Sequence, residues 1–275
     1  MKPSIAFIGV GNMARAILGG MIAAGYPASQ IIGTSRTAEK RDKYSATFGI
    51  EMLADNNAAV AKADVVILCV KPVQIQGVIE AFATQVRAEQ VFLSVAAGVK
   101  LAAMEKWLGL PVSVVRSMPN TPSQVGAGMT GLIANAHTSK AQKVWVSDVF
   151  ASIGDSVWVD DEAHMHIVTA LSGSAPAYFF RFLEAMIKSG QAQGLNEDAC
   201  RRLAAYTMLG AAQMVTELDE PISQLRKHIT SPKGTTEHAL LSFEASNIDK
   251  MVADAMTACA ERSKQLARQF SGQTE

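Results

Sequence analysis

The first 160 residues of the chain alternate short apolar runs with longer alanine-rich segments. Runs rich in β-branched residues occupy positions 5–8, 31–32, 65–70, 91–95, 112–115 and 157–159. Segments of helical length, among them 13–24 and 73–85, lie between several of these runs. Continuous apolar strands separated by helices are typical of a parallel sheet whose two faces are both covered. We therefore expect an α/β, doubly wound sheet in this part of the chain.

The pattern changes after residue 159. Residues 160–275 hold no convincing strand, and long segments of Ala, Leu, Met, Glu and Arg predominate. Apolar residues at helical spacing predict one helix around 203–215 and another around 251–259. We expect a dinucleotide-binding domain over 1–160 and an all-α C-terminal domain over 161–275. A helical half with this much apolar surface either closes on itself or interlocks with a second copy, and we favour a dimerisation domain.

The composition is that of an ordinary globular protein and excludes several classes. The chain has 275 residues, 49% of them hydrophobic and 18% charged, and its formal net charge is +0. This balance argues against a nucleic-acid partner. The three cysteines are widely spaced and suggest no disulfide framework. We find no signal-peptide pattern and no apolar run near the roughly 20 residues that span a bilayer, so we expect a cytoplasmic protein with no membrane segment.

The strongest local signal is a glycine-rich turn between the first expected strand and the first expected helix. It reads Ile8-Gly9-Val10-Gly11-Asn12-Met13-Ala14. Gly9 allows a tight turn, Gly11 lets the backbone approach a pyrophosphate, and Ala14 permits close packing of the helix on the strand. The helix N-terminus would then offer free N–H groups to the phosphates. A glycine turn that binds nothing is the alternative, but the flanking strand and helix favour a Rossmann-like nucleotide site.

The end of the second expected strand indicates which dinucleotide is bound. An NAD-specific fold places an acidic side chain there, on the ribose 2′-hydroxyl. Here the sequence reads Gly33-Thr34-Ser35-Arg36-Thr37, with no acid before Glu39. The Arg36 guanidinium and the hydroxyl of Ser35 suit a 2′-phosphate. We expect NADP as the cofactor, with NAD bound less well, unless Arg36 is simply a solvated surface residue.

Three further loops follow strands of the same expected sheet, at the edge where such folds bind ligands. They are Val70-Lys71-Pro72, Ser94-Val95-Ala96-Ala97-Gly98-Val99 and Arg116-Ser117-Met118-Pro119-Asn120-Thr121-Pro122. The small residues Ala96 and Ala97 leave room for a nicotinamide ring, and Asn120 offers an amide between two stiffening prolines. Each loop alone could be a tight turn, but together they indicate one cofactor site.

The exceptional stretch of the helical half is Thr230-Ser231-Pro232-Lys233-Gly234-Thr235-Thr236. It stands directly before an apolar helical run, as at a helix N-terminus whose exposed N–H groups suit a small carboxylate. Simple capping is the alternative interpretation, since Ser and Thr cap helices generally. A second segment, 171–178, joins two expected helices and is expected to line the same pocket.

Taken in order, these segments resemble the pyrroline-5-carboxylate reductases along nearly the whole chain. The residues that carry the resemblance lie at 8–13, 70–72, 96–98, 116–122, 172–178 and 230–236, and the last two segments are highly specific. The resemblance implies a Rossmann domain and a helical domain that interlocks across a homodimer, with dimers assembling further, up to a decamer of five dimers. It also implies NAD(P)H-dependent hydride transfer to the cyclic imine 1-pyrroline-5-carboxylate, which yields L-proline and completes proline biosynthesis.

By the same resemblance, the loop at 230–236 binds the substrate carboxylate through backbone amides. Thr236 matches the threonine whose hydroxyl lies near the ring nitrogen, and it is the one catalytic residue that we assign. The substrate-binding positions are Ser231, Gly234, Thr235 and Thr236, and the cofactor-binding positions are Gly9, Gly11, Asn12, Met13, Ser35, Arg36, Lys71, Pro72, Ala96, Ala97 and Asn120. Because cyclic imines protonate readily, catalysis would come mainly from holding the ring carbon about 3–3.5 Å from the nicotinamide.

Two residues depart from the pattern of the family. Its loop usually reads Ser-Pro-Gly-Gly, and Lys233 stands in place of the first glycine. If that position needs a positive φ, lysine costs roughly 1 kcal/mol or more; alternatively, its ammonium adds a cation near the carboxylate. Lys227 stands where many members carry an acid.

Other interpretations compete with this one. The β-hydroxyacid dehydrogenases share the architecture but need a catalytic lysine on the inter-domain helix, and residues 177–181 contain none. A non-catalytic NADP-binding protein would need only the nucleotide site. No metal is expected at His164 and His166, because side chains two residues apart on a helix do not face each other.

Overall fold

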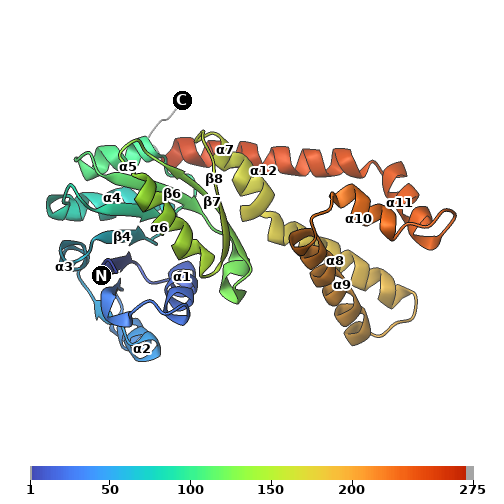
Figure 1. The fold of residues 1–275 in the computed structure, drawn as a ribbon, viewed down its shortest axis with the longest axis horizontal. Helices are drawn as coiled ribbons and strands as arrows, with labels where there is room; N and C mark the ends of the chain where they lie inside the picture. The colour runs from blue at the N-terminus through green and yellow to red at the C-terminus, as the bar shows by residue number, and fades with distance from the viewer. Residues whose placement is uncertain (1, 271–275) are drawn as a thin grey trace. The chain divides into compact units, whose positions relative to one another are not determined.

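A computed structural model describes residues 2–270 of the chain (Figure 1). Within them the N-terminal part forms an eight-stranded sheet in the order β3-β2-β1-β4-β5-β6-β7-β8. Neighbouring strands pair in parallel, except that β6 and β7 are antiparallel. The expected doubly wound sheet is therefore confirmed. Its strands are β1 (Ile5–Ile8), β2 (Ile31–Thr34), β3 (Glu51–Leu53), β4 (Val65–Leu68), β5 (Val91–Ser94), β6 (Ser113–Met118), β7 (Gly128–Ala134) and β8 (Gly154–Trp158).

Helices alternate with these strands, and the described elements after β8 are all helical. The helices are α1 (Asn12–Ala23), α2 (Ala38–Phe48), α3 (Asn56–Lys62), α4 (Pro72–Phe82), α5 (Leu101–Leu108), α6 (Lys140–Ala151), α7 (His164–Val168), α8 (Ala175–Ala192), α9 (Glu197–Glu217), α10 (Ile222–His228), α11 (Thr235–Ala245) and α12 (Ile248–Phe270). Short 3-10 turns lie at η1 (Ala28–Gln30), η2 (Ala83–Gln85) and η3 (Thr121–Val125), and a π-helical turn, η4 (Thr169–Gly173), precedes α8. After β8 the described residues form no strand, as the sequence pattern predicts.

Two apolar clusters pack on opposite faces of the sheet. Successive strand residues point to opposite faces, so Ile8 and Leu68 enter one cluster while Phe7 and Ile67 enter the other. Helices α3, α4 and α5 cover the first face, and α1, α2 and α6 cover the second. Figure 1 shows α4 and α5 on one side of the sheet and α1 and α6 on the other. Burial on both faces explains the continuous apolar strand runs in the sequence.

Two strands lie outside the apolar runs of the sequence. β3 has only three residues and is partly exposed. β7 contains Gly128 and Gly131, and a side chain at Gly131 would collide with Val168 of α7. β7 therefore needs glycine where neighbouring segments approach closely, so it lacks the run of β-branched residues that marks most of the other strands. The expectation that Arg116–Met118 form a loop is wrong, because these residues complete β6, where backbone pairing with β7 continues to Met118.

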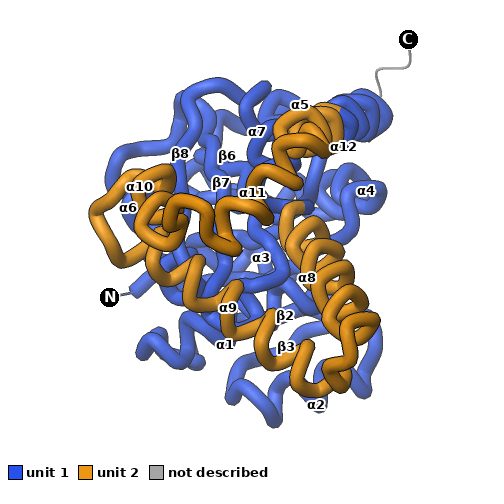
Figure 2. Tube along the Cα trace, turned by 90° about the vertical axis from the view of Figure 1, so that its right-hand side faces the viewer, with its two compact units in different colours: residues 1–174, 258–275 blue, residues 175–257 orange. Residues whose placement is uncertain are grey.

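The chain divides into two compact units, coloured separately in Figure 2. The first comprises residues 1–174 together with 258–275, and the second comprises residues 175–257. The expected boundary near residue 160 lies between β8 and α7; as a division between functions it stays a prediction. None of the described helices combines the length and the apolar character needed to cross a bilayer.

Large apolar side chains are exposed on the helices of the second unit. Phe179 and Phe180 of α8 are 58% and 61% exposed, and Leu203 and Tyr206 of α9 are 60% and 73% exposed. Monomeric proteins rarely leave large contiguous apolar patches in water. These helices therefore present the kind of surface that another copy of the chain would cover.

A buried ion pair joins β6 to the segment that precedes α7. The Arg116 guanidinium is 3.0 Å from a carboxylate oxygen of Glu162, and the Arg116 side chain is only 3% exposed. The same carboxylate oxygen accepts the backbone N–H of Leu101, at the start of α5, at 2.9 Å. Burial lowers the pKa of Arg116, and Glu162 opposes this shift by stabilising the charged form. Glu162 thus connects β6 to the start of α5, the helix that follows β5.

Replacing Glu162 by glutamine should destabilise the protein. The substitution removes the charge that compensates a buried guanidinium, and we expect the free energy of unfolding to fall by about 2–3 kcal/mol. Urea titration followed by circular dichroism measures this loss. Glu89→Gln is the control, because Glu89 pairs with Arg87 in an exposed position, and its loss should cost less than about 1 kcal/mol. Equal losses in the two variants would contradict the role of Glu162.

Candidate functional site

The sheet has a switch point between β1 and β4, which are neighbours although β2 and β3 lie between them in the sequence. From β1 the chain continues to β2 on one side, and from β4 it continues to β5 on the other. In such folds ligands bind in the crevice outside the carboxyl ends of these strands. The glycine-rich turn follows β1, and Val70-Lys71-Pro72 follows β4. The structure therefore brings two of the predicted cofactor segments to the same edge.

Gly9 makes the sharp turn that leaves β1. Its φ is 86°, in the left-handed region, and a Cβ atom there would lie 2.7 Å from Cγ1 of Val70. Both the backbone conformation and the close neighbour require glycine. The Gly9 N–H donates to the Thr34 hydroxyl at 3.0 Å, which ties the turn to the end of β2.

Gly11 is the N-terminal cap of α1, and unlike Gly9 it is not required by the backbone conformation or by a close neighbour. Its φ of −110° is open to any residue, and a Cβ atom at Gly11 would meet no described atom within 4 Å. No side chain caps the helix at this end, and the first intrahelical bond there runs from Arg15 to the Gly11 carbonyl at 3.0 Å. The N–H groups of Asn12 and Met13 therefore point out of the helix start, as an anion site requires.

The segment after β2 is held by a residue that the sequence analysis does not include. Nη1 of Arg41 donates to the carbonyl of Ser35 at 2.8 Å and to the carbonyl of Arg36 at 3.0 Å. The Arg36 residue itself is exposed. Because both carbonyls face Arg41, the turn has a fixed backbone from which the Ser35 and Arg36 side chains extend. Many surface arginines occupy a similar position near the start of a helix, so the sequence gives no specific signal for this role.

The next two predicted loops lie beyond β4 and β5. Lys71 is the exposed residue that precedes α4, and Pro72 is its first residue, a position where proline is favoured because its missing N–H would have no partner. After β5, the buried Ser94 hydroxyl accepts the N–H of Ala96 at 3.2 Å. Ala96 is buried and Ala97 is exposed, so Ala97 presents small, uncovered surface at this loop.

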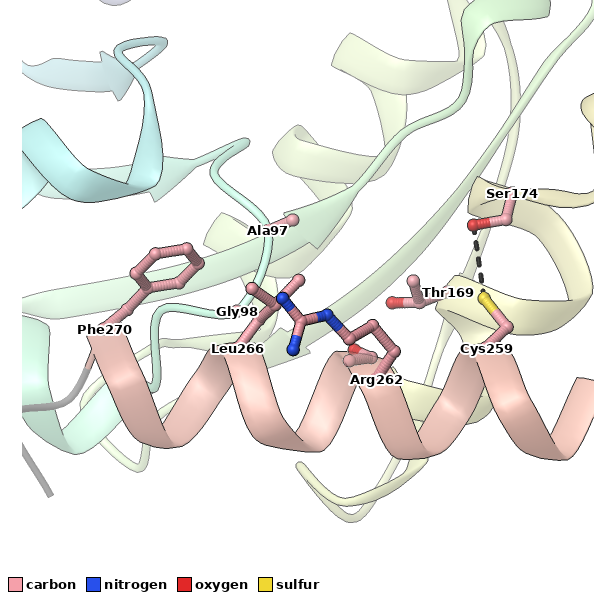
Figure 3. Close-up of a pocket in the computed structure, with 9 residues that line it drawn as sticks. Ala97, Gly98, Thr169, Ser174, Cys259, Arg262, Leu266 and Phe270 are labelled. Carbon is pink, nitrogen blue, oxygen red and sulfur yellow. Dashed lines mark hydrogen bonds between the residues drawn. The ribbon is translucent and has the colours of Figure 1, made fainter. Parts of the chain in front are cut away.

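A cavity of about 210 Å³ opens beside the second of these loops (Figure 3). All of its lining residues belong to the first compact unit, and they come from the loop, from η4 and the residue after it, and from the C-terminal part of α12. Gly98 has a φ of 79°, and a Cβ atom there would lie 3.0 Å from the Phe270 ring. Figure 3 shows Cys259 turned towards Ser174, whose hydroxyl is 3.3 Å from the Cys259 sulfur. The end of α12 thus packs directly against the loop of Ala97 and Gly98.

Asn120 is placed differently from the other predicted cofactor residues. Its side-chain oxygen accepts the N–H of Met129 at 2.9 Å. Its side-chain nitrogen lies 3.3 Å from both the carbonyl and the hydroxyl oxygen of Ser172. The residue is 8% exposed. Its amide therefore joins β6, β7 and η4, and direct use of this amide by a cofactor stays a prediction.

The second compact unit holds the other predicted loop, which forms a tight turn before α11. The Gly234 N–H donates to the Ser231 carbonyl at 3.0 Å, and the intervening residues are Pro232 and Lys233. Lys233 has a φ of 59°. A proline followed by a positive φ is the pattern of a type II turn. Lys233 therefore does adopt the positive φ at which lysine is expected to cost stability relative to the glycine usual in the family.

Gly234 leads from this turn into α11. A Cβ atom there would lie 2.9 Å from the Ser231 carbonyl oxygen, so the turn has room only for glycine. No side chain accepts a bond from the first turn of the helix at this position. The N–H groups of Thr235, Thr236 and Glu237 open the helix and have no partner within it. Three adjacent donors at the positive end of a helix can bind a carboxylate.

Among the described residues, the histidines and acids do not gather into a metal centre. In the described part of the chain, no group of three His, Cys, Asp or Glu side chains is placed to hold a metal ion. Nδ1 of His166 lies 2.8 Å from the Ser263 hydroxyl. Burial, and then the positive charge of Arg116, lower the pKa of His166. A buried neutral histidine with a hydroxyl partner fits a structural role.

Two protein families match this chain. Residues 162–266 match the family described as pyrroline-5-carboxylate reductase dimerisation. Residues 4–98 match the family described as NADP oxidoreductase, coenzyme F420-dependent. The first match covers the helical part from α7 into α12, and the second covers the glycine-rich turn and the loops after β2 and β4.

Relatives match over the whole chain. The pyrroline-5-carboxylate reductase of Pseudomonas aeruginosa is 45% identical over 268 residues, which cover 98% of each chain. The enzyme of the same name from Haemophilus influenzae is 41% identical and covers 97% of this chain and 98% of its own. Among solved structures, a pyrroline-5-carboxylate reductase from Coxiella burnetii has a TM-score of 0.94 and 40% identity, covering 97% of this chain and 99% of its own. A Plasmodium falciparum pyrroline carboxylate reductase with NADP bound has a TM-score of 0.85 and 27% identity, covering 97% and 98%.

The two glycines of the first turn should respond differently to alanine. Gly11→Ala adds a Cβ atom in open space, so we expect an unchanged melting temperature and a dinucleotide dissociation constant raised about tenfold or more. Gly9→Ala forces a left-handed alanine against Val70, so it should lower stability by roughly 1 kcal/mol or more. Calorimetric titration with NADPH and thermal unfolding separate the two effects. Unchanged NADPH affinity in Gly11→Ala would show that this turn does not hold the cofactor.

Proposed function

The chain belongs to the pyrroline-5-carboxylate reductases, and we propose that it reduces 1-pyrroline-5-carboxylate to L-proline with the residues described above. It is an NAD(P)H-dependent oxidoreductase of proline biosynthesis with an N-terminal Rossmann-type sheet. The relationship to the Pseudomonas aeruginosa enzyme, at 45% identity over nearly the whole of both chains, carries this conclusion. A cytoplasmic location is part of the proposal and agrees with the three unpaired cysteines.

The first unit would hold the cofactor at the edge that follows β1, β2, β4 and β5. The helix start after Gly11 supports binding of the pyrophosphate by the N–H groups of Asn12 and Met13. Lys71 and Pro72 stand at the start of α4, and Ala96 and Ala97 lie where small side chains leave space for the nicotinamide. The bound nicotinamide supplies the hydride. The contribution of these residues is to orient its ring, together with the loop that α12 supports.

We assign the preference for NADP to Ser35 and Arg36. The guanidinium of Arg36 is exposed, and no ion pair with another described residue competes for it. Arg41 fixes the carbonyls of both residues, so their side chains extend from a stable turn. A guanidinium can bind a 2′-phosphate with two parallel bonds, whereas the 2′-hydroxyl of NAD offers no such charge.

The turn before α11 would hold the substrate. The N–H groups of Thr235 and Thr236 stand free at a helix start, and they suit the carboxylate of the ring. Ser231 and Gly234 shape the turn through the bond between their backbone groups. The Thr236 hydroxyl would orient the ring nitrogen. Because a protonated imine already has an electron-poor carbon, positioning supplies most of the catalysis and no strong acid is needed.

The second unit supports a homo-oligomer. The dimerisation family covers residues 162–266, and exposed apolar side chains such as Phe180 and Tyr206 lie on α8 and α9 within that range. We propose that residues 161–275 serve as the dimerisation and substrate domain. Assembly of five dimers into a decamer extends the proposal, and size-exclusion chromatography with light scattering measures it directly.

Removing the hydroxyl of Thr236 tests the catalytic role. Thr236→Val keeps the shape and the backbone N–H of the residue, so we expect normal folding and a kcat lowered about tenfold or more. Thr236→Ser, which keeps the hydroxyl, is the matched control and should retain most activity. The assay follows the loss of NADPH absorbance with 1-pyrroline-5-carboxylate. Full activity in Thr236→Val would reject the role, and cofactor binding without any turnover in the wild type would instead indicate a non-catalytic NADP-binding protein.

Removing the charge of Arg36 tests the cofactor assignment. Arg36→Ala should lower kcat/KM for NADPH about tenfold or more while leaving that for NADH nearly unchanged, because a charged pair to the phosphate is lost. Lys43→Ala removes an exposed cation from α2 and serves as the control. The measurement is the ratio of kcat/KM for the two cofactors. If Arg36→Ala and wild type give the same ratio, Arg36 does not select the cofactor.

A further inference from the structure

Lys233 occupies a backbone position where glycine is the favoured residue. It is the third residue of the turn Ser231-Pro232-Lys233-Gly234, and its φ of 59° is left-handed. For an L residue this region brings Cβ close to the following carbonyl oxygen. In a type II turn the third position is therefore normally Gly or Asn. Something must favour this conformation over the alternatives that lysine would otherwise adopt.

The carboxylate of Glu237 provides that interaction. Its Oε2 atom accepts the backbone N–H of Lys233 at 2.7 Å. Glu237 is the third residue of α11, a position from which an acidic side chain can reach back over the helix start, as in a capping box. Here the bond goes to the strained residue itself. The negative charge is also favourable at this end of the helix.

The bond also decides which backbone donors remain for a ligand. The N–H of Lys233 is used by Glu237, and the N–H of Gly234 is used by the Ser231 carbonyl at 3.0 Å. The donors that follow belong to Thr235 and Thr236, at the start of α11. Their directions depend on the turn that precedes them. If Lys233 left its left-handed conformation, Gly234 and the first turn of α11 would shift with it.

We propose that Glu237 is a positioning residue for the substrate loop. By holding Lys233 in a left-handed conformation, its carboxylate keeps the N–H groups of Thr235 and Thr236 directed at the substrate carboxylate. Lys233 and Glu237 therefore act as a coupled pair. The proposal rests on the proposed function of this loop, but the coupling itself is a property of the backbone that exists without substrate.

A double-mutant cycle tests the pair. Glu237→Ala removes the acceptor, so hydrogen exchange of the segment 230–238 should become faster, and KM for 1-pyrroline-5-carboxylate should rise about fivefold while kcat changes little. Glu237→Gln keeps an acceptor oxygen and should restore slow exchange and low KM. Lys233→Gly makes the turn independent of the bond, so Glu237→Ala in that background should have little effect on either measurement. Glu244→Ala is the control, because Glu244 lies exposed on the same helix and its side chain forms no hydrogen bond with the described residues.

The outcomes separate this inference from the proposed function. If Glu237→Ala has the same effect with Lys233 and with Gly at position 233, the residues are not coupled and the proposal is wrong. If Glu237→Gln behaves like Glu237→Ala, charge and not hydrogen bonding is what matters, which also overturns it. If the exchange cycle shows coupling but the wild type does not turn over 1-pyrroline-5-carboxylate, the pair stands and the substrate assignment fails. Exchange is measured by mass spectrometry on the intact chain without ligand.

Discussion

Two helices of this protein start at a glycine, and in our proposal both bind anions. Gly11 precedes α1 and Gly234 precedes α11, and no side chain caps either helix. A Ser or Asp at these positions would fold its own oxygen onto the first N–H groups and satisfy them. Glycine leaves those donors to a ligand, and the helix dipole adds to their attraction for negative charge. In our proposal, the same arrangement of a helix start therefore binds the phosphates in the first unit and a carboxylate in the second.

Much of the fold follows from the pattern of apolar residues. The runs that contain β1 and β4 are apolar at every position because both faces of the sheet are covered. The change to helices after β8 is equally visible in the sequence. β3 and β7 escape this reasoning, because one is a short, partly exposed edge strand and the other contains glycines selected by its neighbours. Tertiary crowding leaves no periodic signal along a chain.

Some residues of the candidate site could likewise be predicted from the sequence, and others could not. Glycines that make sharp turns, such as Gly9, can be recognised from local sequence because their requirement is local. Arg41 and Glu237 could not, because each acts by binding a backbone group several residues away, and many surface arginines and glutamates look identical in sequence. Asn120 shows what residue type alone leaves out, since in the structure its amide is engaged by Met129 and Ser172, and its use by a cofactor stays a prediction. The direction of a side chain is decided by packing in the folded protein, so a sequence motif does not show it.

The discontinuous first unit has a consequence for biosynthesis. Residues 258–270 pack with residues 1–174, yet the whole second unit lies between them in the sequence. At roughly 5–20 residues per second, a ribosome needs on the order of 4–17 s to traverse this insertion. During that interval the nascent sheet lacks Phe270, which in the complete chain packs against its apolar cluster. The surface that this helix covers is therefore a natural binding target for chaperones until residues 258–270 have been synthesised.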